Sequence, residues 1–373
     1  MRITIDARMI GFSGIGRYIQ NLIGAISSID SVNSYDIITG GINPEGSAPP
    51  GLNAKNFKYF SLSADVPIYS FKEQAVLPSV IRSIAPDIVH YPNFNASILS
   101  SKPSVVTIHD LIYYLFSDSC PGLAGQLYAK FMFNAVTRKA KKIIAVSEYS
   151  KQELVKHLGI KADKITVVYH GIDPVYAPVK DKKTLDEIIA RYALNKDYVL
   201  YVGTHQPRKN LVRLIHAFSK VAFKNSSVDL LLTGKVETRW KELYGTAESL
   251  GLKDRVRFLG MVPEKDLPCL YSTAKLFAFP TLYEGFGIPP IEAAACGAPV
   301  MISDRTSLPE VAGDYAVVVN PEDVDEMAKA IERVLESKDL QEELRQKGLK
   351  SAKRFTWKEA ALKTIKVYEE AAG

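Results

Sequence analysis

Residues 279–300 read FPTLYEGFGIPPIEAAACGAPV, and the rest of the chain is interpreted outward from this stretch. Pro289 and Pro290 mark a helix start, because proline has a preset φ and no amide hydrogen for the first turn to leave unpaired. Glu284 then falls in the loop before the helix, and Glu292 falls in its first turns. The stretch therefore predicts two carboxylates flanking a helix N-terminus.

The backbone between the two glutamates predicts a binding site. Glycine permits close approach by a ligand, so we expect the amides of Phe286, Gly287 and Ile288 to contact one. The positive end of the helix dipole favours phosphate or sugar oxygens at the same place. Glu284 can then reach sugar hydroxyls, and Glu292 can accept hydrogen bonds from a ribose diol. The alternative is an ordinary helix start, where the dipole alone favours acids.

Short β-branched runs alternate with amphipathic helical stretches along the whole chain, which predicts parallel sheets with right-handed crossovers. Two such series, each the size of a doubly wound domain, indicate two Rossmann-like α/β domains. The predicted strands are Ile3–Ile5, Ile37–Thr39, Ile88–His90, Val105–Ile108, Ile143–Val146, Ile165–Tyr169, Tyr198–Val202, Val228–Leu232, Val256–Leu259, Leu276–Phe279, Val300–Ser303 and Ala316–Val319.

A turn-rich, charged stretch separates the two series. It begins at Gly171–Pro174 and includes the charged run at 180–183, as an exposed linker would. We therefore expect a first domain at 1–174 and a second at 175–355. Residues 356–373 form a last amphipathic helix, with a threonine as its N-cap.

The second domain opens with YVGTHQPRKN at 201–210. Gly203 ends a strand, and Arg208 and Lys209 arrive just before a helix. Two cations beside a helix N-terminus are typical of a diphosphate site. The alternative is a pair of solvated surface cations.

The first domain carries weaker signals of the same kind. GFSGIG at 11–16, which includes Gly14, predicts a glycine-rich turn before a helix from Arg17, and such a turn can hold phosphate oxygens. It does not match the GxGxxG dinucleotide fingerprint, and a plain tight turn explains it equally well. Asn93 and His109 each follow a strand, where open α/β sheets bind ligands. A structural histidine is the alternative for His109.

The run EGFGIP at 284–289, followed by Glu292, resembles the paired-glutamate signature of the family 4 retaining glycosyltransferases. These enzymes have the GT-B fold, in which two Rossmann-like domains face each other across a cleft. The resemblance implies that the C-terminal helix crosses back to the first domain. It also implies a nucleoside diphosphate sugar as donor and no cofactor.

The resemblance assigns further roles. The amide of Gly14 would face the donor diphosphate, and His109 would lie between the donor sugar and the acceptor, beside Asn93. By position and resemblance, Gly234 and Val262 would border the nucleotide base.

The segment around Gly203, Arg208 and Lys209 resembles the family's Gly-x-x-x-Pro-Arg-Lys-Asn run, with one departure. Many relatives carry arginine directly after the glycine, where this chain has Thr204. One phosphate contact must then come from elsewhere, and Arg208 is the candidate.

The expected activity is transfer of a hexose, with retention, to a hydroxyl of a glycan or lipid-linked acceptor. The Pro-Arg-Lys-Asn segment is similar to that of bacterial mannosyltransferases that build surface polysaccharides, including O-antigen, which suggests GDP-mannose as donor. Three alternatives stay open. They are a UDP-sugar-dependent transferase, another GT-B enzyme such as an epimerase or phosphorylase, and a noncatalytic nucleotide-sugar sensor.

No metal site is predicted. The histidines form no HxxxH or HExxH spacing, and the DxD string at 323–325 is interpreted as the acidic first turn of a helix. The cysteines lie far apart and in no CxxC pair, so we expect free buried thiols at Cys120, Cys269 and Cys296.

The formal net charge of +6 suits an anionic ligand or surface. The densest basic cluster, RKAKK at 138–142, either compensates the partial negative charge at a helix C-terminus or contacts an anionic lipid leaflet. No basic stripe interleaved with aromatic residues suggests a nucleic acid partner. No apolar run approaches the roughly 20 residues of a membrane span, and Asp6 interrupts any signal-peptide core. We therefore expect a cytoplasmic protein, with peripheral contact at the inner membrane face as an open alternative.

Overall fold

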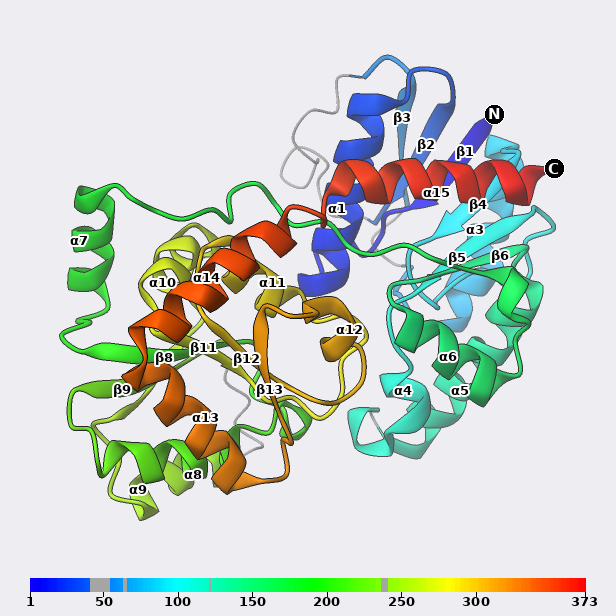
Figure 1. Cartoon of the computed structure of the whole chain (residues 1–373). Coiled ribbons are helices and arrows are strands. Elements are labelled where there is room, and N and C mark those ends of the chain that lie inside the picture. Colours follow the sequence, from blue (N-terminus) through cyan, green and yellow to red (C-terminus); the bar gives the residue numbers. More distant parts are fainter. Residues whose placement is uncertain (41–53, 63–65, 121, 236–240) are drawn as a thin grey trace. The chain divides into compact units, whose positions relative to one another are not determined.

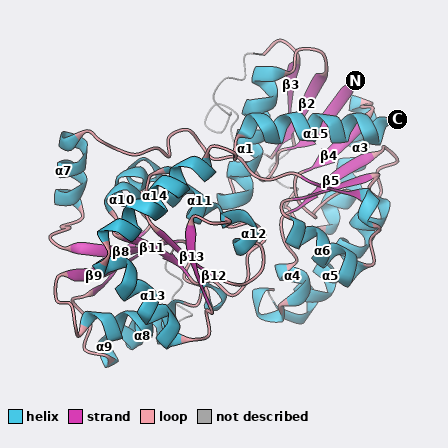
Figure 2. Cartoon of the chain, in the orientation of Figure 1, coloured by secondary structure: helices cyan, strands magenta, loops and turns pink. Residues whose placement is uncertain are grey.

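A computed structural model describes residues 1–40, 54–62, 66–120, 122–235 and 241–373. The chain divides into two compact units: unit 1 is Met1–Gly171 with Thr356–Gly373, and unit 2 is Ile172–Phe355. Each unit contains one parallel sheet with helices on both faces (Figures 1 and 2). The prediction of two Rossmann-like α/β units is confirmed.

The unit 1 sheet has the strand order β3-β2-β1-β4-β5-β6-β7, so its connections reverse direction between β1 and β4. Its strands are β1 (Arg2–Asp6), β2 (Ser34–Thr39), β3 (Phe57–Ser61), β4 (Ile88–Tyr91), β5 (Ser104–Ile108), β6 (Lys142–Ala145) and β7 (Ile165–Val167). The edge strand β3 was not predicted. Its sequence, FKYFS, lacks β-branched residues and only Phe57 is fully buried, so it carries no buried-strand signal.

Helices pack on both faces of this sheet. They are α1 (Ser13–Ile29), α3 (Phe71–Ile84), α4 (Ile112–Leu115), α5 (Gly122–Lys139), α6 (Glu148–Leu158) and α15 (Trp357–Ala372), with 3₁₀ turns η1 (Ser117–Ser119) and η2 (Ala162–Lys164). The C-terminal helix α15 packs against α1 and crosses it (Figure 1), and the hydroxyl of Tyr368 in α15 lies 2.7 Å from Nδ1 of His90 in β4. Thr356 caps α15, as predicted.

Helix α1 begins earlier than the sequence suggested. The predicted start was Arg17, but the structure places Ser13–Gly16 already in the helix. Glycine is a poor helix former, so the sequence favoured a turn there. Gly14 and Gly16 therefore belong to the first helical turn rather than to a loop.

The unit 2 sheet has the order β10-β9-β8-β11-β12-β13, so its connections reverse between β8 and β11. Its strands are β8 (Asp197–Val202), β9 (Val228–Thr233), β10 (Val256–Gly260), β11 (Leu276–Phe279), β12 (Val300–Ser303) and β13 (Ala316–Val319). All six were predicted, because each is a short run of mostly apolar residues, as strands of a parallel sheet with helices on both faces are.

Eight α-helices are described in unit 2. They are α7 (Lys182–Arg191), α8 (Leu211–Ala222), α9 (Lys241–Ser249), α10 (Leu267–Thr273), α11 (Ile288–Ala295), α12 (Leu308–Ala312), α13 (Val324–Glu336) and α14 (Lys338–Ala352), with 3₁₀ turns η3 (Pro207–Lys209) and η4 (Glu264–Asp266). Asp323 caps α13 by accepting hydrogen bonds from the amides of Asp325 and Glu326. The DxD string is therefore a helix start, as predicted.

Across the described ranges, no helix is both long and apolar enough to cross a bilayer. The three cysteines are free thiols. Cys269 and Cys296 are buried, but Cys120 is only partly buried, so the expectation of burial was wrong there. Cys120 lies just after the short turn η1, where less of the chain covers it.

Candidate active site

Arg208, Lys209 and Glu284 meet at the carboxyl edge of the unit 2 sheet. The two cations lie in η3 after β8, and Glu284 lies in the loop after β11. Because β8 and β11 are neighbours where the connections reverse, their loops meet at the position where such sheets bind ligands. Oε1 of Glu284 accepts a hydrogen bond from Nζ of Lys209 and lies 3.5 Å from Nη1 of Arg208.

Hydrogen bonds tie the two loops together. The amide of Leu282 donates to the carbonyl of Arg208 at 2.8 Å, and Nη1 of Arg208 donates to the carbonyl of Tyr283 at 3.3 Å. Nε of Arg208 donates to Oε1 of Gln206 at 3.1 Å. The side chains of Arg208, Lys209 and Glu284 keep only 22%, 9% and 14% of their exposure. These charges are therefore well positioned and weakly screened by water.

Two residues that the sequence did not single out hold Glu284 from a third loop. Oγ1 of Thr306 accepts from the amide of Glu284 at 3.2 Å, and Oγ of Ser307 donates to its carbonyl at 3.0 Å. Both residues follow β12, the next strand of the sheet. Their position after a strand end was the signal that could have found them.

Helix α11 starts where the sequence predicted, with Gly287 as N-cap and prolines in its first turn. Gly287 has φ +88°, and a Cβ there would lie 2.4 Å from Cδ2 of Leu308, so only glycine fits without displacing Leu308. The first amides of α11, from Ile288 onward, have no acceptor within the helix. The ring of Phe286 packs edge-on against Phe355, so Phe286 can offer a ligand its backbone rather than its ring.

Glu292 lies on the covered side of α11 and is 1% exposed. Its Oε2 accepts a hydrogen bond from the hydroxyl of Tyr271 at 3.3 Å. Burial raises the pKa of the neighbouring Cys296 thiol, and the charge of Glu292 raises it further. Protein surrounds this carboxylate, so contact with a ribose diol stays a prediction.

Three adjacent strands of unit 2 end in glycines that lie side by side. The amide of Gly234 donates to the carbonyl of Gly260 at 2.8 Å, and the amide of Gly203 donates to the carbonyl of Thr233 at 3.1 Å. A Cβ on Gly234 would lie 1.9 Å from the carbonyl oxygen of Gly203, so a larger residue is excluded. Val262, two residues beyond Gly260, is half-buried. This edge is therefore lined by backbone, and its contact with a base stays a prediction.

In unit 1, the structure brings the ends of β4 and β5 together. Nε2 of His109 lies 2.9 Å from the carbonyl oxygen of Pro92, next to Asn93. Burial lowers the pKa of His109 to about 4, so its imidazole is neutral near pH 7. A carbonyl only accepts, so Nε2 carries the proton and Nδ1 is left as the acceptor.

Aromatic neighbours set the plane of the His109 ring. His170 stacks on it at 5.4 Å between ring centres, and Tyr18 meets it edge-on at 4.8 Å. The hydroxyl of Tyr18 lies 3.0 Å from Oγ1 of Thr107, which fixes the tyrosine. The sequence analysis missed Tyr18 and His170. His170 comes three residues after the end of β7, and that position was an available signal. Tyr18 lies in the first turns of α1, the helix that follows β1.

Two other predicted residues of unit 1 have clear positions. Asn93 is 6% exposed, and its Nδ2 donates to the hydroxyl of Tyr69 at 2.9 Å and lies 3.4 Å from Sδ of Met9. Gly14 is the exposed second residue of α1, and a Cβ there would meet no atom within 4 Å. Packing therefore does not require glycine at position 14. The predicted ligand contacts of both residues stay predictions.

In the described part of the chain, no group of three or more His, Cys, Asp or Glu side chains is placed to hold a metal ion. The sheet edge of unit 2 instead carries two cations, a carboxylate and backbone amides. Such a set can bind a polyanion and sugar hydroxyls. The sheet edge of unit 1 carries the neutral imidazole of His109.

Comparisons with known proteins match both halves of the chain. The model described as "Glycosyltransferase Family 4" matches residues 12–176, and "Glycosyl transferases group 1" matches residues 185–351. O-antigen chain mannosyltransferase B of Escherichia coli is 33% identical over 287 residues, covering 76% of this chain and 74% of its own. Serotype-specific mannosyltransferase WbdA of Escherichia coli is 31% identical over 77% of this chain, which spans only 37% of WbdA.

Solved structures share the fold over nearly the whole chain. Anabaena HepE in complex with UDP-glucose superposes with a TM-score of 0.80 at 19% identity, covering 99% of both chains. Sucrose-phosphate synthase from Thermosynechococcus elongatus gives a TM-score of 0.79 at 20% identity, covering 99% and 98%. These neighbours have the GT-B fold, so the predicted fold class is confirmed.

Proposed function

This chain belongs to family 4 of the glycosyltransferases, and on that premise we propose that it transfers a hexose from a nucleoside diphosphate sugar to an acceptor hydroxyl, with retention at the anomeric carbon. The observation that carries the proposal is the cluster of Arg208, Lys209 and Glu284 at the switch point of unit 2. It combines cations for a leaving diphosphate with a carboxylate for sugar hydroxyls.

In the reaction, the bond from the anomeric carbon to the diphosphate oxygen breaks, and negative charge develops on the diphosphate. Arg208 and Lys209 would stabilise that charge, and their partial burial makes the interaction stronger than in water. The amides at Ile288 and Gly14, each at a helix N-terminus, would add hydrogen bonds to phosphate. The acceptor oxygen forms the new bond to the same carbon, and its proton passes to the departing phosphate oxygen.

Three polar groups would orient the substrates. Glu284 would accept hydrogen bonds from hydroxyls of the donor sugar, and Glu292 from the ribose. His109 would accept a hydrogen bond from a substrate hydroxyl at Nδ1, since its Nε2 proton is directed at the carbonyl of Pro92. The acceptor side would include Asn93, and the base would lie near Gly203, Gly234 and Val262.

The proposed donor is GDP-mannose, and the proposed acceptor is a glycan or lipid-linked saccharide in polysaccharide or lipopolysaccharide synthesis. Two observations support this choice. The curated relatives at 30% identity or more include O-antigen mannosyltransferases of Escherichia coli and Salmonella typhimurium. The Pro-Arg-Lys-Asn segment at 207–210 is similar to that of such enzymes. We also propose that the protein works in the cytoplasm, in peripheral contact with the anionic inner face of the membrane.

Donor binding and transfer can be tested separately. Thermal unfolding with GDP, UDP or ADP should show the largest shift for GDP, since a ligand at a hundred times its Kd adds about 2.7 kcal/mol of stability. Incubation with GDP-mannose and a mannose-terminated acceptor should give an α-linked product, which retains the donor configuration, by NMR of the anomeric proton. Binding without any transfer would favour a nucleotide-sugar sensor, and a β-linked product would contradict retention.

A further inference from the structure

Unit 1 has a basic hollow of about 470 Å³ at the edge of its sheet opposite His109. Lys142 opens β6 and Lys164 directly precedes β7, so the hollow lies at the amino ends of these strands, whereas His109 follows the carboxyl end of β5. Its charged lining consists of five cations and one acid: Arg138, Lys141, Lys142, Lys161, Lys164 and Asp163. The hollow is therefore separate from His109 and its neighbours in unit 1.

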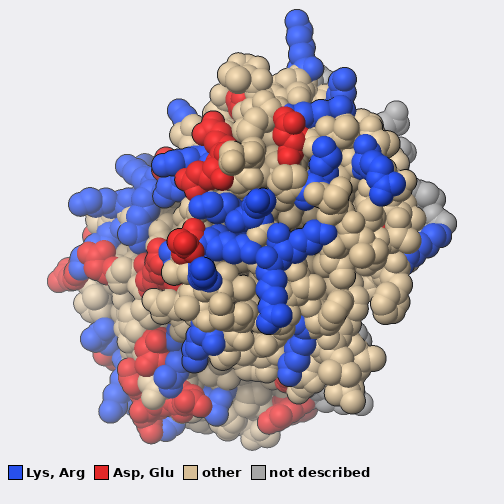
Figure 3. All heavy atoms as spheres, turned by 90° about the vertical axis from the view of Figure 1, so that its right-hand side faces the viewer, with Lys and Arg blue, Asp and Glu red and all other residues tan. Residues whose placement is uncertain are grey.

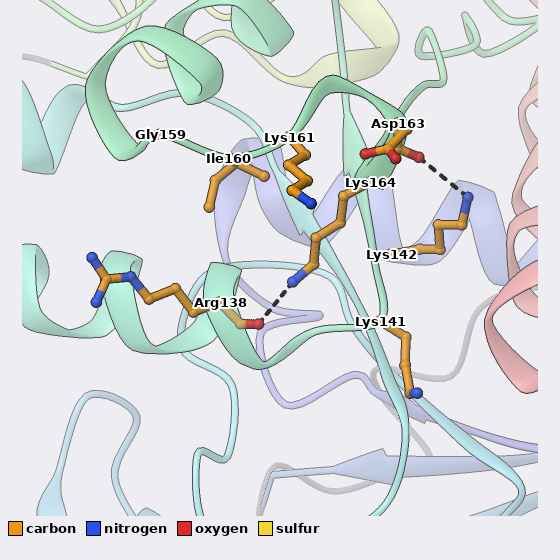
Figure 4. Close-up of a pocket in the computed structure, with 8 residues that line it drawn as sticks. All are labelled: Arg138, Lys141, Lys142, Gly159, Ile160, Lys161, Asp163 and Lys164. Atoms are coloured by element: carbon orange, nitrogen blue, oxygen red, sulfur yellow. Dashed lines mark hydrogen bonds between the residues drawn. The ribbon is translucent and has the colours of Figure 1, made fainter.

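Two of these cations are held by the protein itself (Figure 4). Nζ of Lys164 donates to the carbonyl of Arg138 at 2.7 Å, and Nζ of Lys142 donates to the carbonyl of Asp163 at 3.3 Å. Lys142 also forms an ion pair with Glu370 at 3.0 Å. Burial lowers the pKa of Lys164, and the neighbouring charge of Lys141 lowers it further. The lysines thus repel one another, and a bound anion would relieve that repulsion.

The other three cations of the basic hollow are Arg138, Lys141 and Lys161. Among the described residues, no carboxylate lies within ion-pair distance of any of them. All three are exposed. Figure 3 shows Lys and Arg side chains gathered across the middle of the face that it presents. The interpretation of the 138–142 cluster as a simple helix end is incomplete, because residues 161 and 164 from beyond α6 extend it.

An exposed apolar stripe runs along α5 toward this hollow. Leu123, Leu127 and Phe131, spaced four residues apart on one helix face, are 72%, 59% and 59% exposed. Arg138, seven residues after Phe131, falls on the same face by helical periodicity and lines the hollow. Exposed apolar stripes of this kind mark interaction surfaces.

We propose that the basic hollow and the α5 stripe together form the surface through which unit 1 lies on an anionic lipid membrane. This inference rests on the proposed function, which places the protein at the membrane. Phosphate head groups would occupy the hollow, and Leu123, Leu127 and Phe131 would enter the boundary between head groups and acyl chains. A second copy in symmetric contact would instead bring the same cations together, so charge complementarity favours lipid.

The position of α4 fits this assignment. Helix α4 begins three residues after His109 and packs against α5. Tyr113 within α4 and Phe116 directly after it are exposed. A lipid-anchored acceptor would therefore leave the membrane close to the chain segment that carries His109.

The test is co-sedimentation of the full chain with vesicles, which needs neither donor nor acceptor. Wild type should bind vesicles of phosphatidylcholine with 30% phosphatidylglycerol, bind neutral vesicles much less, and lose binding as salt rises. The Arg138→Gln, Lys141→Gln, Lys161→Gln variant should bind on the order of a hundredfold more weakly, because each cation near the surface contributes about fivefold. The Leu127→Ser, Phe131→Ser variant should bind at least about tenfold more weakly.

A matched control removes the same charge elsewhere. Lys180→Gln, Lys253→Gln, Lys265→Gln changes three exposed lysines of unit 2 and should bind like wild type. Equal binding of the Arg138/Lys141/Lys161 variant and this control, or equal binding of neutral and anionic vesicles, would overturn the assignment. A second outcome would also overturn it: the wild type forms a concentration-dependent dimer, the Leu127→Ser, Phe131→Ser variant does not, and that variant binds vesicles like wild type.

Two readouts separate this inference from the proposed function. All variants should keep the wild-type melting temperature and transfer to a water-soluble acceptor, because the changed residues are exposed and none belongs to the candidate active site. Vesicle binding by a protein that transfers no sugar would contradict the proposed function but support the membrane surface. Normal transfer without vesicle binding would support the proposed function but contradict the membrane surface.

Discussion

Lys209 and Glu284 form an ion pair in unit 2, although 75 residues separate them in the sequence. Each comes from a loop that follows one of two neighbouring strands, β8 and β11. With side chains only 9% and 14% exposed, each charge compensates part of the other's cost of burial. A diphosphate would compete for Lys209, so the pair connects donor binding to the position of Glu284.

Glu284→Ala should lower kcat for transfer on the order of a hundredfold, because an oriented group at the reacting sugar is lost. It should also lower the free energy of unfolding by about 1–3 kcal/mol, since the nearly buried Lys209 loses its carboxylate partner. Urea denaturation and initial rates measure the two effects. The control is Glu248→Ala, which breaks an exposed pair with Lys253 and should change neither by a measurable amount. Unimpaired transfer in Glu284→Ala would remove it from the site.

Lys209→Ala and Arg208→Ala should weaken binding of a diphosphate more than of a monophosphate. In wild type, GDP should raise the melting temperature well above the effect of GMP at equal concentration, because the β-phosphate adds contacts with the cations. In the variants this difference should shrink. Each variant should also lose about 3 kcal/mol of transition-state stabilisation, measured as a lower kcat/KM. A GDP–GMP difference that persists in both variants would place the diphosphate elsewhere.

Glu292→Gln should remove discrimination between a ribose and its dideoxy analogue. Wild type should bind GDP more tightly than 2′,3′-dideoxy-GDP, because only the diol can donate to the carboxylate. The variant should bind the two with similar affinity in calorimetry. Glu292 is covered by protein, so a change in stability alone is expected for a structural role as well. Discrimination preserved in Glu292→Gln would argue against the ribose contact.

The pH profile of kcat/KM should have no acid limb near 6.5 from His109. Burial lowers the pKa of His109 to about 4, so the neutral ring persists down to that pH. The same shift makes stability fall as pH falls from 6.5 toward 4, because the unfolded chain binds the proton more readily. His109→Asn should lower transfer and reduce this loss of stability on acidification. An acid limb near 6.5 that disappears in His109→Asn would show a normal, solvent-exposed imidazole.

Glu73 should make unit 1 less stable as pH rises from 4.5 to 7. Its side chain is buried and accepts a hydrogen bond from Nη1 of Arg8 at 2.9 Å. Burial raises its pKa to about 7, against the opposing effect of Arg8, so the folded protein holds the proton that the unfolded chain releases. The free energy of unfolding should fall by up to about 3 kcal/mol across this range. Glu73→Gln should flatten that slope, and an unchanged slope would assign it to other groups.

Part of the candidate site could be predicted from local sequence. EGFGIPP predicted the start of α11 and the loop position of Glu284, because proline and glycine act on the backbone directly. The hydrogen-bond partners of these residues could not be predicted. Nothing in the sequence near Glu284 indicated that Thr306 and Ser307 would hold its backbone, or that Tyr271 would cover Glu292.

The alternation of apolar strands with amphipathic helices determined by itself that the chain contains parallel sheets, since that periodicity reports which side of each element is buried. Only the tertiary structure decided that β8 lies beside β11, that His109 meets Pro92, and that the cations after α6 join those at the end of α5. Periodicity is a local property, whereas strand order and the contacts it creates depend on how distant elements pack to exclude water.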